Sequence, residues 1–72
     1  MMTDTKERLT AREKEVINHV AVGKANKRIA LDLGISEATV ENHLTNIYRK
    51  WKVGNRTEAT VQAIRLGVFV WE

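Results

Sequence analysis

The chain has 72 residues, of which 43% are hydrophobic and 29% are charged. This length and composition fit one small globular domain and leave no room for a second. A core of this size is hard to build around an enclosed substrate cavity, so we do not expect an enzyme. The sequence has no cysteine and only two histidines, which excludes a disulfide framework and a zinc site of the usual ligands. We therefore expect no metal and no cofactor.

Twelve Lys and Arg residues against nine Asp and Glu residues give a formal net charge of +3, which favours anionic partners. The basic residues fall into two groups, and no acidic residue stands between Glu41 and Glu58. One group is Lys24, Lys27 and Arg28, and the other is Arg49, Lys50, Lys52 and Arg56. No stretch has the length of a membrane span or the pattern of a signal peptide, so we expect a cytoplasmic protein with no membrane partner.

Two helices are predicted in the first half of the chain. The first begins after Thr10, because Thr10 and Glu13 have the spacing of a capping box. Its apolar face comprises Val16, Ile17, Val20 and Ala21. The second covers about residues 26–33, carries Ile29, Ala30 and Leu33 on one face, and stops at Gly34.

Two more helices are predicted in the second half. Ser36 is a good N-cap for a helix that runs to about Lys52, and Asn55 followed by Glu58 repeats the capping spacing for a helix over about residues 56–66. All four glycines end helical segments, where a left-handed residue is commonly needed. The apolar tail at 68–71 is expected to fold back on the helices. The sequence therefore predicts an all-α, four-helix, bundle-like domain.

The short connection Gly34-Ile35 between the second and third helices is typical of a helix-turn-helix. Projected at 3.6 residues per turn, the third helix divides into three stripes. The predicted buried seam is Val40, Leu44, Ile47 and Trp51. The opposite face is polar and free of large hydrophobes, and comprises Ala38, Glu41, Asn42, Thr45 and Arg49. A flanking stripe of hydrogen-bond donors comprises Thr39, His43, Asn46 and Lys50.

Four segments carry a family resemblance: Leu-Thr-Ala-Arg-Glu-Lys-Glu-Val at 9–16, Asn-Lys-Arg-Ile-Ala at 26–30, Ile-Ser-Glu-Ala-Thr-Val at 35–40 and Asn-Arg-Thr-Glu-Ala at 55–59. With these the chain resembles the LuxR/FixJ-type DNA-binding domain of bacterial transcription regulators, from Leu9 to about Gly67. The resemblance implies an effector domain over residues 5–70 that acts in the bacterial nucleoid, often as the C-terminal part of a response regulator. It also implies a dimer formed through the fourth helix.

Carried over by position, the resemblance implies a helix-turn-helix at 26–45 that places the third helix in the major groove of double-stranded DNA. The base-reading positions would be Glu41, Asn42 and Thr45. The DNA-backbone positions would be Thr39, His43, Asn46 and Lys50, and the dimer contacts Thr60, Val61, Ile64 and Val68. We expect the basic residues Lys27, Arg49 and Arg56 to add to the backbone contacts. The implied partners are duplex DNA, a second copy of the chain and RNA polymerase, with no small-molecule ligand.

Four residues depart from the family pattern, and one of them, Arg28, stands where Glu is frequent and adds positive charge. Glu41 stands where Lys or Arg is frequent, which predicts an unusual sequence preference or a low affinity for DNA. Ala25 replaces a Ser or Thr cap, so Asn26 is expected to cap the second helix instead. Lys52 replaces a turn-forming residue, so the third helix is expected to run on.

Two alternative interpretations remain open. The helix-turn-helix could serve protein interaction, with the fourth helix and the tail as the contact surface and only weak nonspecific DNA binding. Alternatively, Val61 and Ile64 could simply hold the tail at 68–71 rather than a second copy. RNA binding has little support, because no exposed aromatic pair suggests stacking on unpaired bases.

Overall fold

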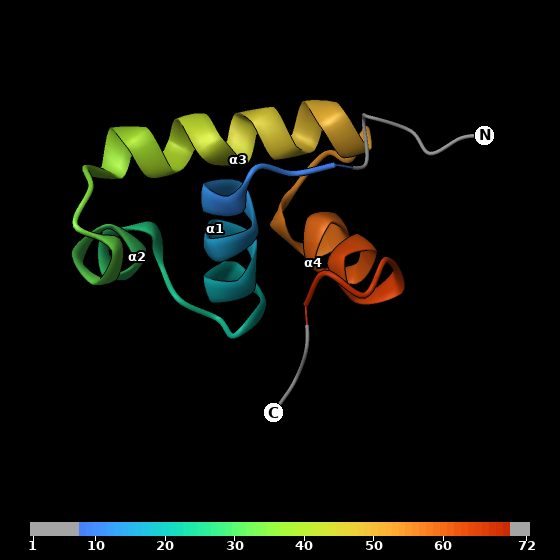
Figure 1. The fold of residues 1–72 in the computed structure, drawn as a ribbon, viewed down its shortest axis with the longest axis horizontal. Coiled ribbons are helices and arrows are strands. Elements are labelled where there is room, and N and C mark those ends of the chain that lie inside the picture. The colour runs from blue at the N-terminus through green and yellow to red at the C-terminus, as the bar shows by residue number, and fades with distance from the viewer. Residues whose placement is uncertain (1–7, 70–72) are drawn as a thin grey trace.

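The computed structural model describes residues 8–69, and within that range the chain forms four α-helices and no strand. They are α1 (Ala11–Ala21), α2 (Asn26–Leu33), α3 (Glu37–Trp51) and α4 (Arg56–Arg65). The longest, α3, lies across one side of the molecule, with α1, α2 and α4 beneath it (Figure 1). The predicted all-α, four-helix fold is confirmed, and no helix among residues 8–69 is long and apolar enough to cross a bilayer.

Three of the four helices begin at a side-chain cap that the sequence predicted. Thr10 and Glu13 form a reciprocal capping box at the start of α1, with bonds of 3.0 and 3.1 Å. Ser36 accepts from the Thr39 N–H at 3.0 Å, and Asn55 accepts from the Glu58 N–H at 2.9 Å. These bonds satisfy N–H groups that have no partner within the first turn of a helix.

The start of α2 differs from the prediction. Ala25 is the N-cap residue and makes no side-chain cap, while Asn26 is the first helical residue. The Asn26 amide does not cap α2, because both of its ends bond to side chains of other helices. The expectation that Asn26 replaces the missing cap is therefore wrong.

Helices α2 and α3 both end at a residue in the left-handed conformation, a glycine in α2 and a lysine in α3. Gly34 ends α2 at φ 70°, and the next N–H, of Ile35, bonds to the Ala30 carbonyl at 3.0 Å. Lys52 ends α3 at φ 55° in the left-handed region, which a glycine adopts more readily. Two predictions are thus wrong: α3 does not run on through Lys52, and Gly54 is not a left-handed helix stop. The chain must turn at Lys52 because Val53 packs against the core directly after it.

The core is centred on α1 and α3, each of which contacts the other three helices. The predicted seam of α3 is buried throughout, and the largest fully buried side chains come from α1, α2 and α3. Ala59 and Ala63 are the buried residues of α4, and their small side chains allow α4 to lie close against α1. The core residues of the four helices are Val16, Ile17, Val20, Ile29, Ala30, Val40, Leu44, Ile47, Trp51, Ala59 and Ala63.

The chain folds back after α4, as predicted for the tail. The Val68 and Phe69 N–H groups both bond to the Ala63 carbonyl, at 2.9 and 3.2 Å, and both side chains pack against the core. The remainder of the predicted tail, at 70–71, lies outside the described residues. The start of the tail therefore belongs to the packing of α4 and is not an extended strand.

Candidate nucleic-acid interface

The outward face of α3 is polar and exposed. Because its buried seam fixes the rotation of the helix against α1, the opposite side chains point into solvent. Glu37 in the first turn and Arg49 and Lys50 in the last turn complement the helix dipole. The exposed row is the predicted one: Ala38, Glu41, Asn42, Thr45 and Arg49. A projecting helix face with these side chains has the shape and polarity required to enter a groove of duplex DNA.

The predicted flanking stripe borders this row, and all four of its members are half-buried. The Thr39 hydroxyl lies 2.9 Å from the Ser36 hydroxyl, so it belongs to the start of the helix. The Asn46 amide oxygen accepts a bond of 3.0 Å from Arg49 and holds that guanidinium along the exposed row. The stripe therefore combines solvent-accessible donors with residues that fix their neighbours.

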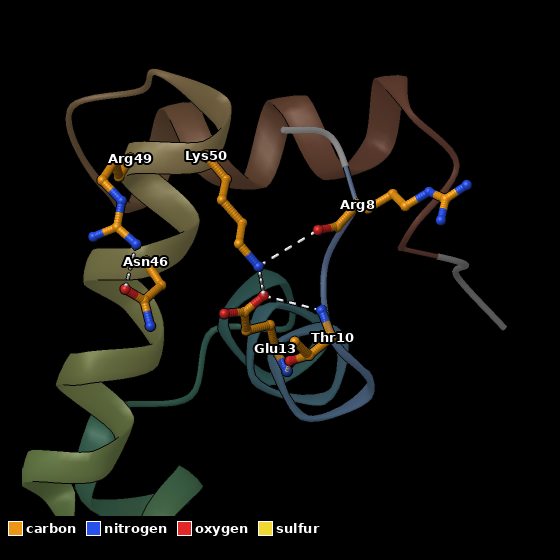
Figure 2. Close-up of polar contacts among 6 residues, drawn as sticks. All are labelled: Arg8, Thr10, Glu13, Asn46, Arg49 and Lys50. Atoms are coloured by element: carbon orange, nitrogen blue, oxygen red, sulfur yellow. Dashed lines mark hydrogen bonds and ion pairs between the residues drawn. The ribbon is translucent and has the colours of Figure 1, made fainter. Parts of the chain in front are cut away.

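Lys50, the last member of the stripe, points away from the exposed row and toward α1 (Figure 2). Its ammonium donates to Glu13 Oε1 at 2.7 Å and lies 3.5 Å from the Arg8 carbonyl oxygen. The same Glu13 oxygen accepts from the Thr10 N–H. Only 5% of the Glu13 side chain and 26% of the Lys50 side chain are exposed. This contact is thus an ion pair, largely shielded from solvent, that fastens the start of α1 to the end of α3.

The surroundings of Glu13 keep it ionised. Burial alone would raise the pKa of this carboxyl, but the bonds from Lys50 and from the Thr10 N–H, with the nearby charges of Lys50 and His43, lower it below the ordinary 4.5. Since Glu13 is negative at neutral pH, it neutralises Lys50 within the domain. The positive potential that Lys50 adds to the outer surface is correspondingly smaller.

Arg56 is also engaged inside the domain. From the first turn of α4 it donates to the Asn26 amide oxygen and to the Lys24 carbonyl oxygen, each at 2.7 Å. Asn26 in turn donates from its amide nitrogen to a carboxylate oxygen of Glu41 on α3. The structure thus joins the predicted backbone contact Arg56 to the predicted base-reading residue Glu41 through the start of α2.

The remaining cations near α3 are more accessible. Lys27 and Arg49 are exposed, whereas Lys24 and Arg28 share Asp32 at 2.7 and 3.2 Å. The bond from Lys24 is the main reason that the pKa of Asp32 lies below its ordinary value. Lys27 and Arg49 therefore present their charges to an external anion most directly.

The outer face of α4 carries exposed hydrophobic side chains. Val61 is 44% exposed and Ile64 is 57% exposed, whereas Thr60 is half-buried and Val68 packs against the core. Three of the predicted dimer contacts, Thr60, Val61 and Ile64, thus lie on α4, whereas the fourth, Val68, packs against the core. Neither Val61 nor Ile64 belongs to the cluster against which Val68 and Phe69 pack.

Sequence reasoning missed two residues of this region, Glu13 and Asn26. Glu13 was recognised as a cap but not as the buried partner of Lys50, although it shares a helix face with Val16, Ile17 and Val20. The position of Glu13 on this buried face was the signal in the sequence that could have predicted its burial. For Asn26 no local pattern indicates its contacts, because they join three helices. No cluster of three metal-ligating side chains is found among residues 8–69.

Comparison with known proteins decides the family. The family model described as bacterial regulatory proteins, luxR family, matches residues 7–63. The chain belongs to the luxR family. This luxR-family domain is 44% identical to the spore germination protein GerE of Bacillus subtilis over 59 residues, which are 82% of this chain and 80% of GerE. The resemblance predicted from the sequence is confirmed.

The fold comparison agrees. A solved structure of the transcription factor GerE superposes with a TM-score of 0.82 and 37% identity, over 86% of the luxR-family domain and 92% of that chain. The transcriptional regulatory protein LnrK of Bacillus subtilis is 46% identical over 88% of this chain but only 29% of its own length. For the CsgBAC operon transcriptional regulatory protein of Escherichia coli the identity is 51%, over 71% of this chain and 24% of that protein. The domain thus spans less than a third of these two regulators and most of GerE.

Proposed function

We propose that this luxR-family domain is the sequence-specific DNA-binding part of a transcription regulator and that it inserts α3 into the major groove. The observation that carries the proposal is the exposed polar row of α3, held outward by a buried seam. Short polar side chains on such a row can reach base edges without a steric barrier. The names of the relatives, which are transcriptional regulators and a transcription factor, support the same function.

Within this proposal the side chains divide into two roles. Asn42, Thr45 and Glu41 face the base edges and set the sequence preference, whereas the cations at the rim bind phosphates. Lys27 and Arg49 supply most of the phosphate attraction because they are exposed. Lys50 and Arg56 contribute less per charge, since Glu13 and Asn26 already occupy part of their donor capacity. Thr39, His43 and Asn46 add hydrogen-bond contacts along the flank.

The proposal includes a dimer formed through the exposed face of α4. Val61 and Ile64 leave apolar area in solvent within the described part of the chain. A two-fold contact through this face would cover that area and place two α3 helices on two related half-sites. Contacts with RNA polymerase would then follow from the position of the dimer on a promoter.

The test compares two arginines at several salt concentrations by fluorescence anisotropy with labelled duplex DNA. Arg49→Ala removes a cation from the exposed row, and the matched control Arg65→Ala removes an exposed cation from the last turn of α4. We expect Arg49→Ala to weaken binding to every sequence and to reduce the slope of log K against log salt by about 0.9. Equal losses for the two variants would contradict docking through α3. Asn42→Ala, in contrast, should change the ranking of sequences.

A further inference from the structure

Glu41 is the one acidic side chain of the exposed α3 row, and its direction is set by the rest of the domain. A glutamate on a helix surface has three rotatable side-chain bonds and ordinarily samples many positions in solvent. Here one carboxylate oxygen, Oε2, accepts a bond from the Asn26 amide nitrogen at the start of α2. The residue itself remains exposed. Its second oxygen, Oε1, is therefore held near a defined place on the groove-facing surface.

Asn26 can hold Glu41 because Arg56 holds Asn26. The Asn26 amide oxygen accepts from Arg56 Nη1 at 2.7 Å, which leaves the amide nitrogen directed at the carboxylate. The opposite orientation of the amide would place its nitrogen against a guanidinium and its oxygen against a carboxylate, so only one orientation satisfies both partners. Arg56 is fixed in turn by a second bond to the Lys24 carbonyl oxygen.

Both ends of this chain of contacts, Arg56 and Glu41, act on Tyr48 of α3 through their charges. Burial raises the pKa of the Tyr48 phenol, while the charge of Arg56 lowers it and the charge of Glu41 raises it. Glu41 and Tyr48 lie seven residues apart, or about two turns of α3, on the same face of the helix. The bonds of Arg56 are partly buried, whereas the bond from Asn26 to Glu41 lies at the surface.

We propose that Asn26 is a positioning residue for sequence recognition, which aims the Glu41 carboxylate at one base pair so that Oε1 accepts from an exocyclic amino group. This inference rests on the proposed function. In the major groove, cytosine N4 and adenine N6 are the amino groups that a carboxylate can accept from, and cytosine N4 is its usual partner. A fixed carboxylate selects more sharply than a mobile one, because less conformational freedom is lost when the contact forms. The same carboxylate repels phosphates, so it disfavours binding where no amino group lies opposite it.

The variant Asn26→Asp tests this role with little risk to the fold. An aspartate still offers an oxygen to Arg56, and a negative residue in the first turn of α2, which has none, suits the helix dipole. The substitution also places a carboxylate against that of Glu41, which releases the glutamate side chain. Glu41→Ala and the double variant Asn26→Asp/Glu41→Ala complete the set. All four proteins are first checked for an unchanged circular dichroism spectrum.

The readout is the ratio of dissociation constants for duplexes that differ by one base pair from the wild-type preferred site, measured at each position in turn. We expect Asn26→Asp to reduce discrimination by roughly 5- to 10-fold at a single position, the one where wild type prefers an amino-bearing base. Glu41→Ala should remove the preference between base pairs at the same position. The double variant controls for the negative charge that Asn26→Asp adds. When Asn26→Asp is added to Glu41→Ala, the affinity for all duplexes should fall equally, and every ratio of dissociation constants should stay unchanged.

Three results would overturn the inference. If Asn26→Asp leaves the ratios of dissociation constants unchanged, Glu41 recognises its base pair without Asn26. If Asn26→Asp still changes a ratio in the Glu41→Ala background, Asn26 acts independently of Glu41. Loss of discrimination at every position equally would indicate a merely structural role. Wild-type protein that prefers no duplex at all would instead contradict the proposed function, so the two failures are distinguishable.

Discussion

The ion pair between Glu13 and Lys50 makes a prediction about stability whose size follows from the structure. In Lys50→Met the Glu13 carboxylate, which is 4% exposed as a residue, keeps only the Thr10 N–H as a partner among residues 8–69. Removing one member of a buried ion pair typically costs about 3 to 5 kcal/mol, and an exposed pair contributes about 0 to 1 kcal/mol. Because 26% of the Lys50 side chain is exposed, water can partly replace it, and we expect a loss of about 2 kcal/mol.

A loss of this size is large for so small a domain. It corresponds to a decrease of roughly 8 to 16 °C in melting temperature for a chain of about 60 to 100 residues. The assay is thermal and urea unfolding at pH 7, followed by circular dichroism. The matched variant Glu13→Gln retains an amide oxygen for the Thr10 N–H and leaves Lys50 free to turn into solvent, so it should cost about half as much.

The relative size of the stability losses in Lys50→Met and Glu13→Gln shows which member of the ion pair is costly to leave without its partner. The double variant Glu13→Gln/Lys50→Met should be more stable than the sum of the single losses predicts, because it leaves no buried charge without a partner. A Lys50→Met loss smaller than that of Glu13→Gln, or strictly additive losses, would refute the argument that the buried carboxylate is the costly member.

The same pair predicts a dependence on pH. Because the folded-state pKa of Glu13 lies below its ordinary 4.5, the stabilisation is fully present above about pH 4.5 and is lost as the pH falls through the folded-state value. The difference between wild type and Lys50→Met should therefore narrow as the pH falls toward the folded-state value of wild type, where Glu13 takes up a proton in both proteins. A difference that stays constant from neutral pH into strong acid would contradict the assigned ionisation.

Three further predictions concern other elements. Ala25→Ser supplies the missing cap of α2 and should stabilise the domain by about 1 kcal/mol in urea unfolding. Lys52→Gly removes the strain of a lysine in the left-handed region and should raise the free energy of unfolding by roughly 0.5 kcal/mol. Gly34→Ala, at φ 70°, should lower it by about 1 kcal/mol in the same assay. Ile64→Asp should leave the melting temperature nearly unchanged but abolish the proposed dimer in sedimentation velocity; Leu31→Asp, at a more exposed site on α2, is the matched control. A dimer that persists in Ile64→Asp would exclude this face of α4.

The helices and the exposed row were predictable because their signals are local. The cap at Thr10, the stop at Gly34 and the 3.6-residue spacing from Val40 to Trp51 each depend on residues within a few positions of one another. The amphipathic spacing also determined which α3 side chains face outward before any tertiary contact was known.

The departures have a tertiary origin. Lys50 and Glu13 are 37 residues apart, and Arg56 and Asn26 are 30 apart, so no local pattern pairs them. Lys50 was predicted to face DNA from the helical projection, and Arg56 from its place in a basic segment. Neither signal shows that α1 and α2 supply nearer partners. The end of α3 at Lys52 has the same cause, because the position of Val53 in the core determines where the helix stops.

The central claim, that α3 reads duplex DNA, is tested most directly by selection of the purified chain against a pool of random duplexes at low and near-physiological salt, followed by sequencing. The account predicts an enriched motif of two related half-sites that persists at the higher salt, with an amino-bearing base opposite Glu41. Weak binding that disappears with salt and enriches no sequence would contradict it and would favour a basic module for protein interaction.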